Sequence, residues 1–119
     1  MYRFEKLKAW QEGMNLVEDI YKLTTSFPKR EAFGLVDQLR RAVSSVPLNI
    51  AEGSGCNTDK EFVQFLTVAR RSLYEVVTAV KIAERLGYIQ EIEVTHSLAK
   101  CDKVGSLING LINSLRKSR

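Results

Sequence analysis

The sequence is poor in the residues that build metal sites and cross-links. Its 119 residues include two cysteines, Cys56 and Cys101, and one histidine, His96. No Cys-x-x-Cys pair occurs, so the ligand spacing of a zinc site is absent. We therefore expect two reduced thiols, no metal and no cofactor.

Long apolar runs are also missing, which bears on where the protein works. No stretch approaches the ~18–20 apolar residues needed to cross a bilayer. The first ten residues, MYRFEKLKAW, are charged and amphipathic and lack the apolar segment of a signal peptide. We expect a cytoplasmic protein with no membrane partner.

Proline and strand-like alternation are scarce, so helix is the dominant element. The only prolines are Pro28 and Pro47. Apolar residues recur every three or four positions in four segments, at about residues 5–26, 30–52, 58–85 and 89–116. Such segments joined by short loops are typical of a helix bundle. The sequence predicts an all-α single domain (residues 1–119), an antiparallel up-down-up-down four-helix bundle with a proline-kinked second helix.

Each segment has an apolar stripe that is expected to face the core. The stripe of the first segment is Leu7, Trp10, Met14, Val17, Ile20 or Tyr21, and Leu23. The stripes of the other three are Val36, Leu39, Val43, Val46 and Ile50; Phe62, Leu66, Ala69, Leu73, Val76, Val80 and Ala83; and Val94, Leu98, Cys101, Val104, Ile108, Leu111 and Leu115. These stripes predict one shared core.

The ends of the segments carry signals of their own. Thr58 and Glu61 have the spacing of a capping box at the start of the third helix. Gly53 is expected to end the second helix in the left-handed conformation, and the sequence LGY at 86–88 is a similar glycine stop. The basic tail RKSR is expected to fray.

Pro47 interrupts the second segment without interrupting its stripe. A proline inside a helix costs about 3 kcal/mol, because it removes one hydrogen bond and crowds the preceding turn. Burial of Val46 and Ile50 could return ~1.5–3 kcal/mol each. The pattern therefore predicts one bent helix rather than two helices.

A polar stripe runs beside this proline. Arg41, Ser45, Asn49 and Glu52 are spaced by four, four and three residues, which places them on one helix face. Two interpretations stay open. The stripe with Pro47 is either a binding or subunit-contact site, or a hydrogen-bonded cluster that supports the bend.

The same region resembles a known family. The stretch LRRAVSSVPLNIAEGSG (39–55) resembles the signature of the four helix bundle proteins, also known as intervening-sequence proteins of large-subunit ribosomal RNA. Further similar stretches are FEKLKAWQ (4–11), FPKREAFGL (27–35), EFVQFLTVARRSLYE (61–75) and RLGYI (85–89). The resemblance implies an antiparallel four-helix bundle that assembles as a homopentamer. The family is similar in fold to the accessory protein of diversity-generating retroelements, a pentameric binder of nucleic acid. The resemblance implies no enzymatic activity.

The charge pattern permits a nucleic-acid-binding function. The formal net charge is +4. Candidate contacts with RNA or DNA are the paired and C-terminal cations Arg40, Arg41, Arg70, Arg71, Arg116 and Lys117. The alternative for these residues is an ordinary solvated surface, in which Arg71 pairs with Glu75 four positions away.

Two further functional classes can be compared with this one. A structural or protein-interaction module would use apolar residues off the main stripe, such as Val63, Val68 and Ile82, to meet another subunit or partner. Catalysis is disfavoured: Glu93 and His96 form one Glu-x-x-His, whereas a di-iron bundle site needs two. No phosphate-binding glycine loop occurs either. The sequence predicts no catalytic residue.

Overall fold

The protein is all-α, as predicted. The computed structural model describes residues 1–117 and, within them, contains no strand. Its elements are two short 3-10 helices, η1 (Arg3–Lys6) and η2 (Lys29–Glu31), and four α-helices, α1 (Lys8–Thr24), α2 (Leu35–Ser54), α3 (Asp59–Arg85) and α4 (Glu91–Lys117). The second helix starts later than predicted, because η2 and Gly34 precede it.

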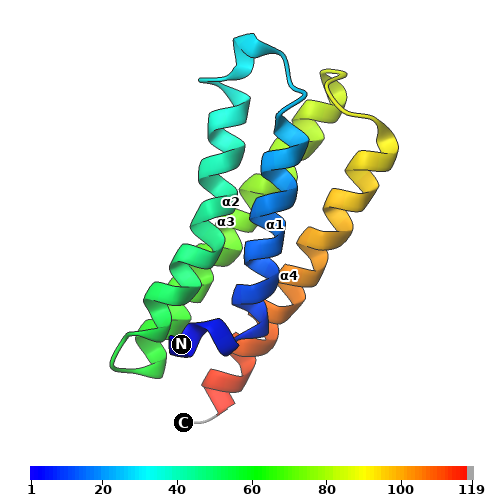
Figure 1. Ribbon diagram of the computed structural model, residues 1–119. Helices are drawn as coiled ribbons and strands as arrows, with labels where there is room; N and C mark the ends of the chain where they lie inside the picture. Colours follow the sequence, from blue (N-terminus) through cyan, green and yellow to red (C-terminus); the bar gives the residue numbers. More distant parts are fainter. Residues whose placement is uncertain (118–119) are drawn as a thin grey trace.

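The four helices form an elongated bundle of 47 × 23 × 23 Å. Helix α1 packs on α2 and α4, and α3 packs on the same two neighbours. Figure 1 shows the ribbon running up α1, down α2, up α3 and down α4, with both chain ends at the same end of the bundle. The groove between α1 and α2 therefore lies across the bundle from the one between α3 and α4.

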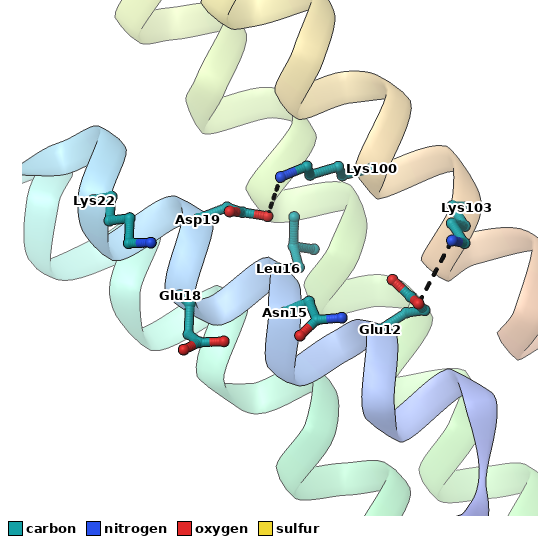
Figure 2. A pocket seen from close by; sticks show the side chains of 8 residues that line it. All are labelled: Glu12, Asn15, Leu16, Glu18, Asp19, Lys22, Lys100 and Lys103. Carbon is teal, nitrogen blue, oxygen red and sulfur yellow. Dashed lines mark hydrogen bonds and ion pairs between the residues drawn. The ribbon is translucent and has the colours of Figure 1, made fainter.

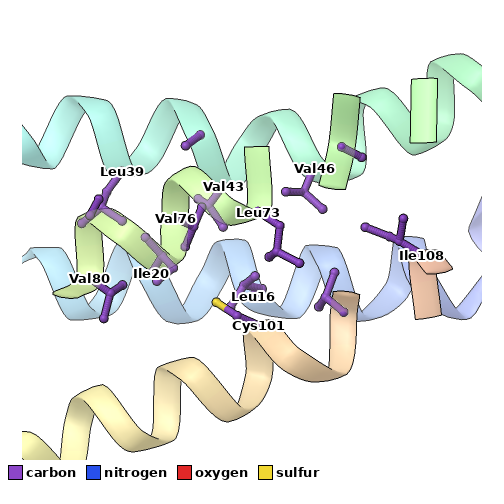
Figure 3. Close-up of a cluster of buried hydrophobic side chains, with 14 of the residues drawn as sticks. Leu16, Ile20, Leu39, Val43, Val46, Leu73, Val76, Val80, Cys101 and Ile108 are labelled. Carbon is purple, nitrogen blue, oxygen red and sulfur yellow. The ribbon is translucent and has the colours of Figure 1, made fainter. Parts of the chain in front are cut away.

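The core lies along the bundle axis and draws on all four helices (Figure 3). Every residue of the stripe predicted for α3 is buried. In α2, Leu39, Val43, Val46 and Ile50 are fully buried. In α4 the buried side includes Ser97 and Ile112, whereas the predicted Leu98, Leu111 and Leu115 are half-buried.

The buried side of α1 differs from the predicted stripe, mostly by one position. It consists of Ala9, Gly13, Leu16, Ile20 and Thr24. Trp10 and Val17 are only half-buried and Met14 is 40% exposed. A Cβ added to Gly13 would meet Pro47 at 3.6 Å, so small residues on this side let α1 approach α2 closely. The prediction was wrong because it followed the large apolar side chains rather than the small ones that set the distance between helices.

Helix α2 continues through Pro47 from Leu35 to Ser54, so the second segment is one helix. Its bend stays a prediction. The expectation for Gly53 was wrong: this residue lies inside α2, and its φ is not positive. The reason for glycine there is packing, because an added Cβ would lie 2.7 Å from the Cβ of Phe65 on α3.

The predicted start and stop of α3 are confirmed, but only half of the capping box forms, because the Glu61 carboxylate accepts from the Thr58 hydroxyl at 3.0 Å and not from its backbone N–H. The backbone N–H of Glu61 donates to Thr58 Oγ1 at 3.1 Å, which caps the first turn. At the other end Gly87 has φ 78°, and the N–H of Tyr88 reaches the carbonyl of Ala83 at 2.9 Å. This six-to-one hydrogen bond is the Schellman pattern of a glycine-terminated helix.

One side chain joins the two loops at the far end of the bundle from the chain termini. Tyr88 Oη donates to Glu31 Oε2 at 2.6 Å, and the other oxygen of Glu31 accepts the N–H of Leu35 at 3.1 Å. The same carboxylate therefore caps α2 and holds the α3–α4 loop. The hydrogen bond from Tyr88, followed by that from Leu35, lowers the pKa of Glu31 below its usual range.

Candidate nucleic-acid interface

The six cations predicted to contact nucleic acid do not gather in one patch, and Arg40 is the most committed to the fold. Its Nε donates to Thr24 Oγ1 at 3.0 Å and its Nη2 to the carbonyl of Tyr21 at 3.2 Å. The guanidinium also lies 4.5 Å above the centre of the Tyr21 ring. Arg40 thus joins α2 to α1, and few of its N–H groups remain to contact a ligand.

The other arginines of the two pairs are more open. Arg41 is exposed and forms an ion pair with Asp37 at 3.0 Å, an arrangement that contributes little in water. Arg70 Nη1 donates to Asn109 Oδ1 at 2.9 Å and so bridges α3 to α4. Arg71 is exposed, and in the described chain it does not pair with Glu75. Arg71 is therefore the most available of the four.

Arg116 and Lys117 are exposed and form the last turn of α4. The expectation of a frayed tail was wrong for these two residues, and its last two positions, 118–119, lie outside the described residues. Cations at this end of a helix are favoured by the helix dipole. Figure 1 places the end of α4 and the start of the chain at the same end of the bundle, and Lys6 and Lys8 near that start are also exposed.

The polar stripe of α2 divides into two groups. The Asn49 side-chain amide donates to the carbonyl and the hydroxyl of Ser45, both at 2.8 Å. The Ser45 hydroxyl in turn shares a 2.9 Å hydrogen bond with Ser72 of α3. Pro47 instead faces Gly13 of α1, on another side of the helix.

This division bears on the two interpretations of the stripe. Arg41 pairs with Asp37 within α2, and Glu52 is exposed, so neither joins the serine–asparagine network. The network links α2 to α3 and resembles the structural cluster more than a ligand site. Sequence reasoning could not include Ser72, because it belongs to another helix.

An apolar groove between α1 and α2 was not anticipated. It has a volume of about 430 Å³ and is lined by Phe4, Trp10, Met14, Val17, Ser44, Pro47, Leu48 and Ala51. Three of these residues, Trp10, Met14 and Val17, were predicted to lie in the core. Phe4 belongs, with Trp10, to the family-like stretch at residues 4–11. The signal that could have revealed the groove is the pair of small residues at 9 and 13, which take the core positions of α1.

Aromatic rings border this groove at the N-terminus. The rings of Tyr2 and Phe4 are stacked, with centres 5.5 Å apart and planes 5° from parallel. Phe4 is also 5.3 Å from Trp10, at a tilt of 54°. Tyr2 is 72% exposed, so this row of rings begins in solvent and ends in the groove.

A second hollow, between α1 and α4, is polar and carries both signs of charge (Figure 2). Asp19 pairs with Lys100, and Glu12 pairs with Lys103 at 3.5 Å. Each of these carboxylates on α1 pairs with a lysine on α4, so the two ion pairs join the first and last helices.

The described residues offer no metal or membrane-spanning site. No group of three or more His, Cys, Asp or Glu side chains within residues 1–117 could hold a metal ion. No helix in that range is both long and apolar enough to cross a bilayer. Glu93, from the single Glu-x-x-His, accepts the N–H of Gln90 at 3.0 Å at the start of α4. That contact gives it a capping role.

The two thiols differ in environment. Burial raises the pKa of Cys101 to about 12, and Asp102 adds to the effect. Burial also raises the pKa of Cys56, with a further contribution from Glu61. Neither cysteine is an activated nucleophile, because the thiolate is the reactive form.

The apolar residues predicted to lie off the main stripe of α3 differ in their exposure. Val63 belongs to the core, with 8% exposure. Val68 and Ile82 are 40% and 44% exposed, and Tyr74 between them is 60% exposed. These three residues give α3 an apolar component on its outer surface.

Comparisons with known proteins identify a family and a fold. The family model described as 23S rRNA-intervening sequence protein matches residues 5–110. A crystal structure of a protein of unknown function from the S23 ribosomal protein family of Bacteroides thetaiotaomicron is similar in fold, with a TM-score of 0.78. The match has 18% sequence identity and covers 87% of this chain and 97% of that one. No curated protein matches the chain. Neither match indicates an enzyme.

Proposed function

The chain belongs to the 23S rRNA-intervening sequence protein family, and from this premise we propose that it is a non-enzymatic, homo-oligomeric scaffold that binds nucleic acid through phosphates. Sequence preference is slight in this proposal, because the chain has no helix-turn-helix, zinc finger or RNA-recognition motif with which to read bases.

The observation that carries the proposal is the set of cations that the fold leaves open. Arg71, Arg116 and Lys117 are exposed on α3 and α4. The bond between Arg70 and Asn109 fixes the relative height of these helices. Arg116 lies seven residues beyond Asn109, or about 10 Å along α4 at 1.5 Å per residue. In this proposal a phosphate chain contacts these cations at separate places on α3 and α4 rather than in one continuous patch.

Assembly would strengthen a weak patch. A closed homo-oligomer repeats each cation several times, and simultaneous contacts raise the effective affinity for a long strand. A pentamer is favoured by the family resemblance alone. The exposed apolar residues Val68, Tyr74 and Ile82 of α3 are candidates for contacts between copies.

The same apolar surface supports a second candidate function. If Val68, Tyr74 and Ile82 meet a different protein, the chain is a structural or protein-interaction module that binds no nucleic acid. The two functions differ in their response to salt: phosphate contacts release counterions, so nucleic-acid binding weakens linearly in log–log terms as salt rises, whereas binding through this apolar surface does not.

The test is a titration of nucleic-acid-free protein, of known mass by light scattering, with labelled single-stranded and duplex RNA at several salt concentrations. We expect binding at low salt that weakens steeply as salt increases. Replacing Arg116 and Lys117 with Ala should weaken binding and flatten the salt slope by about 0.7–0.9 per lost phosphate contact. A matched control replaces Lys29 and Lys81, exposed cations toward the other end of the bundle, and should leave the slope unchanged.

Three results would contradict the proposal. An absence of binding at low salt, or binding indifferent to salt, leaves the interaction module in its place. A strictly monomeric mass at micromolar concentration contradicts the oligomer.

A further inference from the structure

The aromatic rings of Tyr2, Phe4 and Trp10 form a row at the N-terminus, and packing of the core does not require its outer ring. Tyr2 is 72% exposed, so it buries little apolar surface. Its ring is nevertheless parallel to that of Phe4, which in turn contacts Trp10. Successive flat rings with an open outer member are the arrangement on which unpaired bases stack.

Hydrogen bonds hold this row in place. The backbone N–H of Tyr2 donates to the Glu5 carboxylate at 2.6 Å, and the Gln11 side chain donates to the carbonyl of Glu5 at 2.7 Å. Arg3 Nη2 donates to the carbonyl of Ser54 at 2.9 Å, which fixes η1 across the end of α2. A surface fixed before binding loses less conformational entropy when a ligand arrives.

The groove beside the row is apolar and of a size that admits a flat ring. Phe4 and Trp10 belong to both the row and the groove, so the row leads from the stacked Tyr2–Phe4 pair, through the tilted Trp10 ring, into the groove of about 430 Å³. Pro47 and Leu48 supply its α2 wall.

Charge at this end of the bundle selects the occupant. Lys6 and Lys8 are exposed and lie between Phe4 and Trp10 in the sequence, and Arg116 and Lys117 end α4 at the same end of the bundle (Figure 1). Lys8 and residues 106–111 of α4 line a common hollow. Rings for bases together with cations for phosphates are the combination that binds single-stranded nucleic acid.

We propose that Tyr2, Phe4 and Trp10, with the α1–α2 groove, form a stacking site for unpaired bases of a single-stranded nucleic acid. This inference rests on the proposed function and names the strand class and the residues that meet the bases. Duplex strands are excluded from the site, because their bases are already stacked inside the helix.

The test uses Trp10, which is the only tryptophan of the chain. Oligouridylate and oligoadenylate should quench its fluorescence. A duplex, or an abasic strand of the same length, should leave its fluorescence unchanged, because neither presents an unpaired base. The variant Tyr2→Ala should weaken single-strand binding about 5- to 100-fold, the effect of losing one stacked base. The matched control is Phe33→Ala, an aromatic residue that is 99% exposed in the loop at the other end, and its affinity should equal that of the native protein.

The outcomes separate this inference from the proposed function. Salt-dependent binding without quenching, and with native affinity in Tyr2→Ala, overturns the stacking site and leaves phosphate binding intact. No binding at low salt overturns both. If dilution of nucleic-acid-free protein shifts the Trp10 emission together with a fall in mass, a second copy occupies the groove and the assignment is wrong.

Discussion

Replacing Gly53 with alanine tests a close contact between two helices, α2 and α3. Gly53 lies in the last turn of α2, against the first turns of α3. An added Cβ would lie 2.7 Å from the Cβ of Phe65 and 2.9 Å from Cδ1 of Phe62. The Phe65 Cβ is anchored to the backbone, so α2 and α3 must separate to admit the methyl group.

The expected cost follows from two opposing effects. Overpacking a tight contact costs about 1–3 kcal/mol. Alanine is favoured over glycine within a helix by at most about 1 kcal/mol, and by less in a last turn. The free energy of unfolding should therefore fall by about 1–2 kcal/mol in Gly53→Ala.

Thermal and urea unfolding, followed by circular dichroism at one protein concentration, measure this change. The matched control is Gly110→Ala in α4, where an added Cβ meets nothing within 4 Å. That variant should gain about 0.5–1 kcal/mol, because only helix propensity changes. If Gly53→Ala gains stability as Gly110→Ala does, the close approach of α2 and α3 is refuted.

Three other predictions address the thiols, the loops and the proline. Iodoacetamide should alkylate Cys56 much faster than the buried Cys101 in the folded protein, as mass spectrometry would show; equal rates would contradict the core position of Cys101. Tyr88→Phe should lower the stability to urea at neutral pH and lower it less in acid. The hydrogen bond from Tyr88 lowers the pKa of Glu31 in the folded protein, so the bond stabilises the fold above the ordinary glutamate pKa. This stabilisation is lost as the pH falls through the lowered pKa of the folded state. A destabilisation that is constant with pH would argue against this bond. Pro47→Ala should keep the helical circular dichroism signal, since the apolar stripe already continues through the proline, and a large loss of helix would oppose the single-helix description.

The helices and most of the core could be predicted because the helical repeat determines which residues share a face. This holds best in α3, where Thr58 and Gly87 also mark both ends. It fails in α1 and at Gly53, because small residues leave no hydrophobic signal and their role depends on how closely a second helix approaches. The repeat of apolar residues shows which face of a single helix is buried, but it does not show how far apart two helices pack.

The candidate site was predictable to a smaller degree for a related reason. Arg40 and Arg41 are adjacent and chemically identical in sequence. Successive residues point about 100° apart around a helix, so Arg40 turns to Tyr21 and Arg41 to Asp37. Which arginine stays open depends on the neighbouring helix. The groove around Trp10 depends in the same way on two helices and a preceding turn.

The ion pairs between α1 and α4 have a consequence for how the chain assembles. Asp19 and Lys100 are 81 positions apart, whereas α2 and α3 follow each other across residues 55–58. A chain made from its N-terminus onward can dock α1, α2 and α3 before α4 exists, and domains generally fold in that direction during synthesis. Until α4 docks, the α4-facing side of α1 is open and Glu12 and Asp19 lack their lysine partners. The ion pairs of this hollow therefore form only when the last helix of the chain joins the first.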